Sequence, residues 1–515
     1  MAFTSVSFLI FLLATLVLYY LLPKKLQWIL LLIASYGFYW IGGGKTVLYL
    51  VFTTLTVYLS GRTLGALNAR PKADAAAAAR IRRQKKWVVL ATVLVDFGLL
   101  FVVKYGSFTV ELLQPLAGGK LPAVDFVLPL GISFYMFQSV GYVIDCYRGK
   151  YPVERNLLKL ALFTSFFPQI VQGPISRFRD LGPQLTAPHR LDWDKIKYGI
   201  QLAMWGYFKK LVIAERAAVL VDTVLAHYYN YSGSVIMAAI FFYCIQLYCD
   251  FSGGIDITRG VAEMFGIELA ENFRRPLYAT SLADYWRRWH MTLGQWMRDY
   301  LFYPLTLSKP LGKLGKWTRR HIPGKLGKLI PAALATFVVY FVIGIWHGAN
   351  FRYIVFGLWN GTLITASFLL EGWFAGVRTR LHIRDDSRLW HLFQIVRTCV
   401  LVFLGRYLTR APRLLAAGWM MWQSVANPCF SNLWDGTLLT LGLTMTDIVI
   451  TLCGMAAVLA LEYYQERGGH VRAALEQKHW LVQWLGSLLP LVAILLFGIL
   501  LRGDYIPSAF IYQQF

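Results

Sequence analysis

The chain has 515 residues, of which 57% are hydrophobic, 16% aromatic and only 15% charged. Soluble globular domains carry about 25% charged residues, so this composition excludes an ordinary soluble enzyme and indicates a polytopic membrane protein. The formal net charge of +24 is concentrated in short loops beside apolar runs, which is typical of cytoplasmic membrane-protein loops and argues against nucleic-acid binding.

Apolar runs long enough to cross a bilayer, which takes about 20 residues, recur along the chain. They occupy residues 5–22, 27–42, 46–61, 87–104, 128–144, 199–222, 235–250, 331–346, 351–371, 389–408, 447–464 and 480–501. Residues 157–176 contain Pro168 and a Gly-Pro pair at 173–174, so this stretch is expected to be broken or re-entrant. The apolar residues 411–430 are expected at the membrane interface. The runs therefore predict an all-α polytopic membrane protein.

The basic loops predict the orientation of these spans. Residues 62–86 carry eight basic side chains and a single acid, Asp74, so this loop is expected in the cytoplasm. Counting back through three spans places the N-terminus outside, and the basic segment 309–328 is again expected inside. The last span then sends residues 502–515 outward as a tail. We expect one membrane domain over residues 1–515, in the cytoplasmic membrane, with both termini extracytoplasmic.

Residues 282–302 (LADYWRRWHMTLGQWMRDYLF) have the periodicity of an amphipathic helix, with aromatic and aliphatic side chains on one face and charged ones on the other. His290 falls within the apolar arc of that helix. It is either a structural imidazole satisfied by a backbone carbonyl or a titratable group turned toward a site.

A second imidazole, His347, lies in the stretch GIWHGANF between two apolar runs. Ionisable side chains at membrane depth are costly and are functional candidates, although a structural histidine at a helix end is the alternative. Gly348 would allow a ligand or backbone to approach closely, and Asn350 could orient a substrate or a helix end. A neutral imidazole in a dry site suits a general base that takes the proton of an attacking hydroxyl.

Three further polar side chains lie in apolar surroundings and are candidates for lining a substrate site, namely Asp250, Ser252 and Gln138. Asp250 could equally cap a helix or pair with a lysine. The six cysteines have no metal-binding spacing, and no nucleotide, metal or serine-hydrolase motif occurs. The sequence therefore predicts no metal site and no tightly bound cofactor.

These residues belong to longer segments that resemble the membrane-bound O-acyltransferase family, in the branch of bacterial alginate and peptidoglycan O-acetyltransferases. The segments follow one another in order and are LPLGISFYMFQSVGYVIDCYRG (128–149), FFPQIVQGPISRF (166–178), YCDFSGGIDITRG (248–260), NFRRPLYATSLADYWRRWHMTLGQWMRDYLFYPL (272–305) and WHGANFRYIVFGLWNG (346–361). The resemblance implies a ring of about 11–14 transmembrane and re-entrant helices around a central funnel. A departure is the long basic loop expected over 306–328, where relatives often have a short turn.

The resemblance also implies a chemistry. His347 would be the catalytic histidine of a WHG motif and His290 the second histidine of an RRWH motif. The acyl donor would be acetyl-CoA, or alternatively an acyl carrier protein thioester, and the basic cytoplasmic face independently favours an anionic donor. An extracytoplasmic acetyltransferase of the SGNH type would be the partner that completes O-acetylation of a polysaccharide.

The tail FIYQQF (510–515) resembles an aromatic-tyrosine-aromatic motif of this branch. Tyr512 is therefore a candidate acyl carrier, with an interfacial aromatic anchor as the alternative.

Two other functions remain open. One is a D-alanyl transferase acting on teichoic acid, and the other is a transporter or flippase, against which the absence of a two-fold hydropathy repeat argues.

Overall fold

The computed structural model describes residues 1–71, 73–122, 126–501 and 510. These residues are largely helical, and among them there is no strand but only an isolated bridge between Phe273 and Trp289. The expected all-α architecture is confirmed. Seven helical segments of the described chain are long and apolar enough to cross a membrane, or eight if one bent pair forms a single span. One of the seven, Lys24–Ala69, contains two of the expected spans. The ring around a funnel stays a prediction.

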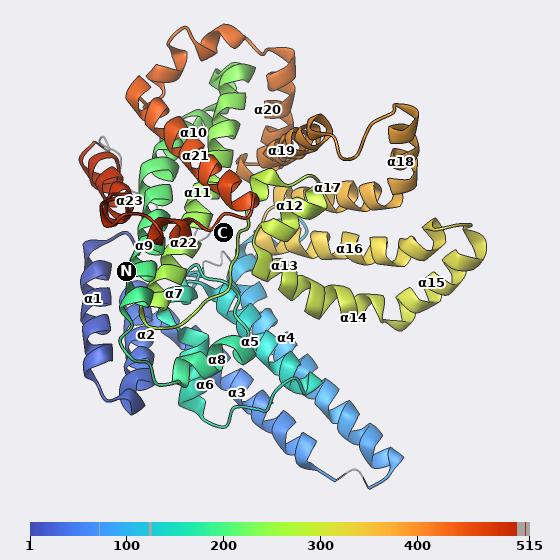
Figure 1. Ribbon diagram of the computed structural model, residues 1–515. Coiled ribbons are helices and arrows are strands. Elements are labelled where there is room, and N and C mark those ends of the chain that lie inside the picture. The colour runs from blue at the N-terminus through green and yellow to red at the C-terminus, as the bar shows by residue number, and fades with distance from the viewer. Residues whose placement is uncertain (72, 123–125, 502–509, 511–515) are drawn as a thin grey trace. The chain divides into compact units, whose positions relative to one another are not determined.

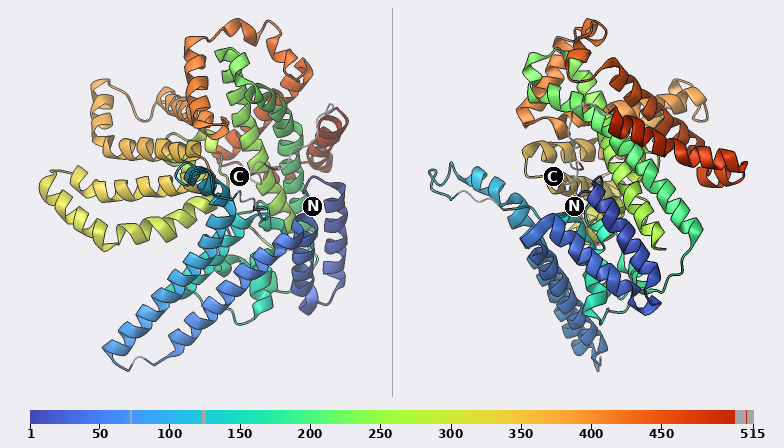
Figure 2. Two further views of the ribbon diagram at one scale, coloured as in Figure 1. Left: turned by 180° about the vertical axis from the view of Figure 1, so that it is seen from behind. Right: turned by 90° about the vertical axis from the view of Figure 1, so that its left-hand side faces the viewer.

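The described residues divide into two compact units, the first within 1–204 and 254–270 and the second within 205–253, 271–501 and 510. The helices of the first unit are α1 (Val6–Leu21), α2 (Gln27–Gly43), α3 (Val47–Ala69), α4 (Ala75–Leu113), α5 (Ile132–Arg148), α6 (Leu157–Ser165), α7 (Phe167–Ile170), α8 (Phe178–Thr186) and most of α9 (Trp193–Tyr207). Figures 1 and 2 show α3, α4 and α5 packed side by side, in agreement with their mutual contacts.

Local sequence explains where the elements of the first unit begin and end. Asp74 caps α4, because its Oδ1 accepts a hydrogen bond of 2.6 Å from the amide of Ala77. The expected basic loop 62–86 is therefore mostly helical, shared between the end of α3 and the start of α4. The stretch 157–176 is broken as expected, since α6 stops at Ser165 and only the single turn α7 follows.

The second unit holds both histidine candidates. Its helical elements are a π-helical stretch Phe208–Ala214, α10 (Glu215–Ala226), the first part of α11 (Gly233–Met264), α12 (Leu282–Arg288), α13 (Met291–Met297), a π-helical turn Arg298–Phe302, α14 (Tyr303–Thr306), α15 (Lys309–His321), α16 (Leu326–His347), α17 (Phe351–Leu369), α18 (Glu371–Arg380), α19 (Arg388–Arg410), α20 (Leu414–Ala426), α21 (Met445–Glu466), α22 (Val471–Glu476), α23 (Trp480–Ala493) and a π-helical end Ile494–Leu500. Short 3-10 turns join some of them, at Tyr228–Asn230, Pro276–Tyr278, Phe430–Leu433 and Thr437–Thr440.

The expectation of a long basic loop over 306–328 is wrong, because residues 309–321 form the helix α15. Its N-cap is Ser308, whose side chain accepts from the amide of Leu311, and Pro310 stands in its first turn, where a missing amide hydrogen costs little. Lysines and arginines at helical spacing then share one side of α15, while Gly315 and Thr318 are buried against α16. The charge pattern of this segment was compatible with a helix all along.

Helices α16 and α17 pack unusually closely (Figures 1 and 2). This packing fixes the position of the turn at residues 347–350 that joins them. A Cβ atom added at Gly344 would lie 2.6 Å from the carbonyl oxygen of Tyr353 and 3.0 Å from Cα of Gly357. One added at Gly357 would lie 2.5 Å from the carbonyl oxygen of Tyr340. Small residues at facing positions let the two backbones touch, as in many membrane helix pairs.

Candidate active site

His347 is the last residue of α16, and the chain turns directly after it. Gly348 is extended, and Asn350 starts α17 by accepting a hydrogen bond of 3.1 Å from the amide of Arg352 through Oδ1. Asn350 is therefore the cap of a helix, the second of the two roles that the sequence left open for it. The motif GIWHGANF is thus a helix end, a turn and a helix start, which holds His347 at the junction of α16 and α17.

The imidazole of His347 is partly exposed and lies among aromatic rings. Its centroid is 4.9 Å from that of Trp346, 5.8 Å from that of Phe356 and 6.3 Å from that of Tyr353, whose ring is nearly parallel to it. Arg352 stabilises Tyr353 by donating to its hydroxyl at 2.9 Å. These contacts restrict the orientation of the ring, and its Nε2 atom is buried although the residue as a whole is partly exposed.

Position 348 requires glycine because the Tyr353 ring approaches its backbone closely. Its extended backbone angles would suit any residue. A Cβ atom built there would lie 2.6 Å from Cε2 and 2.8 Å from Cδ2 of Tyr353, well inside van der Waals contact. Tyr353 is only 4% exposed, so its ring cannot easily move away. Gly348 therefore lets the Tyr353 ring lie beside His347. The group that approaches Gly348 closely is thus a side chain of this protein.

The expected continuous helix over 282–302 is wrong, because α12 ends at Arg288 and α13 begins only after His290. That residue adopts a left-handed backbone conformation (φ 48°, ψ 52°) and separates α12 from α13. An extended segment around Phe273 runs antiparallel beside the break, and the amide of Met291 donates to the carbonyl oxygen of Asn272 at 2.9 Å. Hydrophobic periodicity continued through the break, so the sequence pattern did not reveal it.

Asn272 fixes the protonation pattern of His290. Its Oδ1 accepts hydrogen bonds from the amide of Thr292 at 3.0 Å and from the Thr292 hydroxyl at 2.9 Å, and it lies 3.3 Å from Nδ1 of His290. Since that oxygen is an acceptor, a hydrogen bond between them requires the proton on Nδ1 of His290. Burial lowers the pKa of His290 from 6.5 to about 3, so the side chain is neutral near neutral pH.

Trp346 connects the two histidines. Its ring centroid lies 5.9 Å from that of His290 and 4.9 Å from that of His347. Phe251 packs edge-on against the other side of His290 at 4.9 Å. The structure therefore brings His290 and His347 into one aromatic cluster, in which His290 is buried and His347 is partly exposed.

The segment that contains Phe251 carries two of the other candidates. Asp250 forms an ion pair of 2.6 Å with Nζ of Lys210, which also pairs with Glu215 at 2.7 Å. The hydroxyl of Ser252 accepts from Nζ of Lys209 at 3.0 Å. All of these side chains are buried, so Asp250 has the lysine partner that the sequence offered as an alternative to substrate binding.

Gln138 lies in the first unit, in a chain of buried hydrogen bonds. Its Nε2 donates to the carbonyl oxygen of Phe163 at 2.6 Å, and its Oε1 accepts from Nε2 of Gln169 at 3.1 Å. Ser176 in turn donates to Oε1 of Gln169 at 2.9 Å. Gln138 thus stabilises the broken segment 157–176. Tyr512 lies outside the described residues.

The described chain contains no group of three or more histidine, cysteine or acidic side chains that could hold a metal ion. A scan against family models matches residues 153–405 to the membrane-bound O-acyltransferase family. The chain is 35% identical over 433 residues to the probable alginate O-acetylase of Pseudomonas aeruginosa, covering 82% of this chain and 75% of that protein.

The chain belongs to the membrane-bound O-acyltransferase family. It is a multi-pass membrane protein and an O-acyltransferase. The peptidoglycan O-acetyltransferase of Helicobacter pylori is 28% identical over 308 residues, which cover 55% of each chain. The teichoic acid D-alanyltransferase of Bacillus subtilis is 27% identical over 262 residues, covering 49% of this chain and 62% of that protein.

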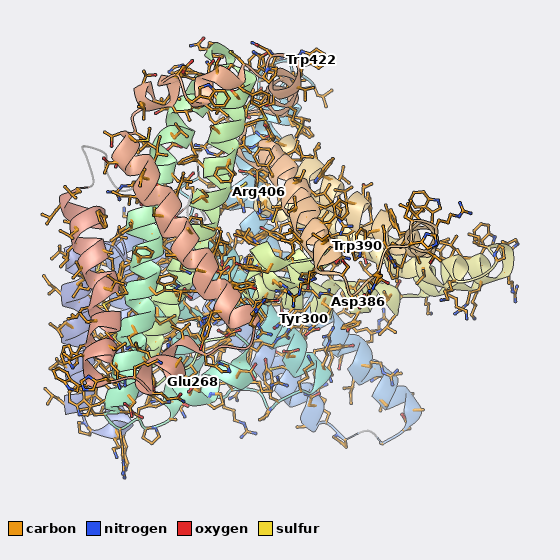
Figure 3. All side chains as sticks on the ribbon, turned by 45° about the horizontal axis from the view of Figure 1, so that its top comes forward. Glu268, Tyr300, Asp386, Trp390, Arg406 and Trp422 are labelled. Carbon is orange, nitrogen blue, oxygen red and sulfur yellow. The ribbon has the colours of Figure 1, made fainter. Side chains whose placement is uncertain are left out.

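Several supporting residues of this membrane-bound O-acyltransferase escaped the sequence analysis. Arg406, labelled in Figure 3, donates to the hydroxyl of Tyr285 at 2.7 Å and lies over the ring of Trp289 at 5.3 Å, which ties α19 to the turn before His290. Asn272 gave one usable signal, since it opens the motif that contains both arginine pairs and His290.

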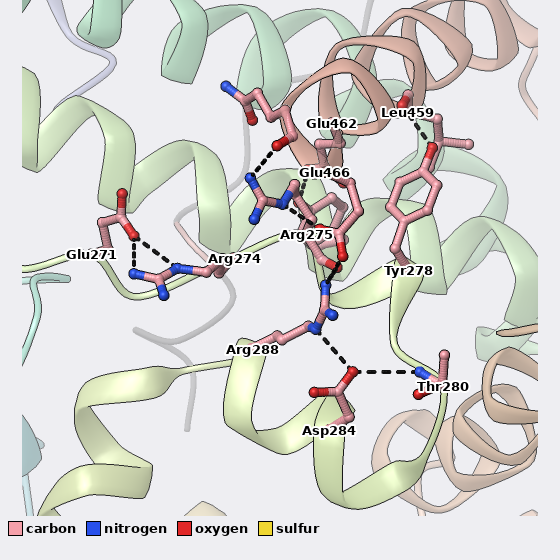
Figure 4. Close-up of polar contacts among 12 residues, drawn as sticks. Glu271, Arg274, Arg275, Tyr278, Thr280, Asp284, Arg288, Leu459, Glu462 and Glu466 are labelled. Atoms are coloured by element: carbon pink, nitrogen blue, oxygen red, sulfur yellow. Dashed lines mark hydrogen bonds and ion pairs between the residues drawn. The ribbon is translucent and has the colours of Figure 1, made fainter. Parts of the chain in front are cut away.

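A network of arginines and acids fixes α12 against the end of α21 in the acyltransferase (Figure 4). Glu466 pairs with Arg275 at 2.6 Å and with Arg288 at 2.9 Å, and Arg288 also reaches Asp284 at 3.0 Å. These groups are between 18% and 29% exposed, so the network positions α12 more than it adds stability.

Proposed function

We propose that this acyltransferase moves an acetyl group from a cytoplasmic thioester, acetyl-CoA, to a hydroxyl of a polysaccharide outside the cytoplasmic membrane. The supporting observation is a partly exposed imidazole, His347, held by aromatic rings at the end of a membrane helix. The relatives named as alginate O-acetylases match about four fifths of this chain at up to 35% identity. The D-alanyltransferases match about half of it at a lower identity, so acetyl is the favoured group.

In the proposed reaction His347 is the general base. Its imidazole takes the proton of the acceptor hydroxyl while the acceptor oxygen attacks the thioester carbonyl carbon. The new C–O bond forms as the C–S bond breaks, and the imidazolium returns the proton to the leaving thiolate. The products are an acetyl ester and a free thiol, and the histidine ends neutral, ready for the next cycle.

His290 has a positioning role in this proposal. It is 3% exposed and its Nδ1 side faces Asn272, so it acts on His347 through the Trp346 ring between them. A neutral imidazole there keeps charge away from the buried aromatic cluster, where an uncompensated positive charge would be costly.

Tyr512 is proposed as the acyl carrier that receives the acetyl group outside, with both termini extracytoplasmic. An SGNH-type acetyltransferase is proposed as the partner that takes the group from Tyr512 to the polysaccharide. Asp250, Ser252 and Gln138 serve this function indirectly, since each is engaged with a side chain or carbonyl of its own unit.

The test uses purified protein in detergent with radiolabelled acetyl-CoA. We expect release of the free thiol and a labelled acetyl group on the protein, identified on Tyr512 by mass spectrometry. The His347→Ala variant should release no thiol above background while it inserts into the membrane and purifies like wild type. Full thiol release by His347→Ala would contradict the role of His347.

The same assay separates the remaining functions. A D-alanyl group on Tyr512, supplied by an aminoacylated carrier protein, with no reaction from acetyl-CoA, would identify a D-alanyl transferase. A transporter or flippase would show no thioester cleavage at all. The Tyr512→Phe variant should keep insertion and lose the label on the tail.

A further inference from the structure

A carboxyl group is buried in the middle of a membrane helix of the first unit. Asp96 is 0% exposed and lies in α4, at the centre of the span expected over 87–104. Most of α4 is exposed along its length, and its buried side chains form one stripe that includes Thr92, Asp96, Leu100 and Val103. Asp96 therefore faces α3 and α5, the two helices on which this stripe packs.

Side-chain contacts between the three helices show which residues lie at the same level as Asp96. Thr92 donates to Ser60 of α3 at 2.7 Å, and Phe97 packs against Phe137 of α5 at 5.5 Å. Gly61 of α3 is in turn close to the Tyr142 ring of α5. Since α4 runs antiparallel to both neighbours, the level of Asp96 corresponds to residues near 53–56 of α3 and near 135–139 of α5.

Three buried hydroxyl side chains occupy this level. Thr53 and Ser139 are 0% exposed, and Tyr135 is 2% exposed. Tyr135 lies within electrostatic reach of Asp96. Both oxygens of Asp96 lack a hydrogen-bond partner among the described residues. The hydroxyls of Thr53 and Ser139 also lack one there.

No positive side chain faces Asp96 from the described parts of α3, α4 or α5. On α4, Lys104 is two turns away and lies over the Tyr105 ring, while Lys85 is three turns away on the other side and lies over the Tyr147 ring. On α3 and α5 the described arginines are Arg62 and Arg148, both toward the Lys85 end of the bundle. The titratable group within electrostatic reach of Asp96 is therefore Tyr135, whose protonated hydroxyl carries no charge.

We propose that Asp96 is an intramembrane proton-binding site. An ionised carboxylate in an apolar interior without a counter-charge is very costly, and the group avoids that cost by taking up one proton from water. The neutral acid then has one O–H to donate and one oxygen to accept, which suits the hydroxyl of Tyr135 and the Thr53 and Ser139 hydroxyls at the same level. The ligand is thus a single proton, and sodium is the competing cation that the test must distinguish from it.

Dicyclohexylcarbodiimide tests this proposal, because it reacts with protonated carboxyl groups in apolar surroundings. The full-length protein in detergent is treated over a pH series, with and without sodium, and adducts are located by mass spectrometry. We expect an adduct on Asp96 that forms more slowly as the pH rises and that sodium does not suppress. The exposed Asp74 at the start of the same helix is the internal control and should stay unmodified.

The isosteric variant Asp96→Asn provides the second measurement. An amide resembles a protonated carboxyl in shape and charge, so the variant should insert and melt within a few degrees of wild type and lose the adduct. The variant Asp96→Ala, which leaves a void, should melt lower than Asp96→Asn. Protection of Asp96 by sodium would identify a sodium site instead, and absence of the adduct at every pH, or a lower melting temperature for Asp96→Asn than for Asp96→Ala, would overturn the proposal.

Discussion

The two histidines of the second unit are built in opposite ways. His347 ends a 22-residue membrane helix, is partly exposed, and packs among aromatic rings. His290 lies between two seven-residue helices, is 3% exposed, and is held by Asn272 next to a β-bridge. In the proposed reaction His347 takes up and releases a proton, whereas burial keeps His290 neutral. Two histidines in one aromatic cluster therefore need not share one task.

The largest expected difference is between His347→Gln and His290→Gln. Loss of a general base lowers the turnover rate by about 100- to 10,000-fold, so His347→Gln should be nearly inactive with an unchanged melting temperature. His290→Gln should lose activity and melting temperature together, because it removes a buried side chain with a defined partner. Thiol release and thermal unfolding in detergent measure both effects. Equal melting temperatures for the two variants would remove the distinction.

Gly348→Ala tests whether ring contacts alone orient His347. The added methyl group would push the Tyr353 ring, and a misplacement of about 1 Å at a catalytic group can cost as much as 100-fold in rate. We expect a turnover rate roughly tenfold to 100-fold lower. The matched control is Gly372→Ala, since a Cβ atom there meets nothing within 4 Å. Wild-type activity in Gly348→Ala would show that the position of Tyr353 does not matter.

Asn272→Ala tests the fixed histidine. It removes the acceptor shared by the Thr292 amide, the Thr292 hydroxyl and Nδ1 of His290. Leaving buried donors without an acceptor costs about 1–3 kcal/mol, so the melting temperature should fall. The conservative variant Asn272→Asp keeps the acceptor oxygen and should regain part of the stability. If Asn272→Ala melts like wild type, His290 is held by its packing instead.

The most gradual expected effect is a pH dependence of stability. The pKa of His290 is lowered by burial from 6.5 to about 3, so below pH 6.5 the unfolded chain binds a proton that the folded chain does not. Stability is therefore complete above pH 6.5 and falls as the pH drops toward 3, by about 2 kcal/mol near pH 5. Melting temperatures of wild type and His290→Gln across this range measure the effect, and the variant should lack this part of the slope. Parallel slopes would contradict it.

The sequence predicted the helical fold, most of the spans and the break after Ser165, because apolar length and helix-breaking residues are local properties. It also placed His347 at a helix end and singled out both histidines. Two local predictions were wrong. The loop over 306–328 is largely the helix α15, since lysines at helical spacing were counted only as charges.

The second error, the continuous helix over 282–302, has a different cause. The break at His290 depends on hydrogen bonds that Asn272 accepts, and Asn272 lies 18 residues earlier in the chain. Periodicity within a segment carries no information about such a partner. The same limit explains why Trp346 was not recognised as the ring between the histidines, and why Asp96 was absorbed into an ordinary span.

The left-handed backbone of His290 has a consequence for which residues this position can accept. Only four described residues other than glycine have a positive φ, and His290 is one of them. An L-residue in that conformation costs roughly 1–2 kcal/mol that glycine does not pay, so the position favours glycine on conformational grounds and histidine on chemical ones. A His290→Gly variant would relax the turn while deleting the ring, and a protein that became easier to fold but slower in catalysis would show a direct conflict between the two demands at a single residue.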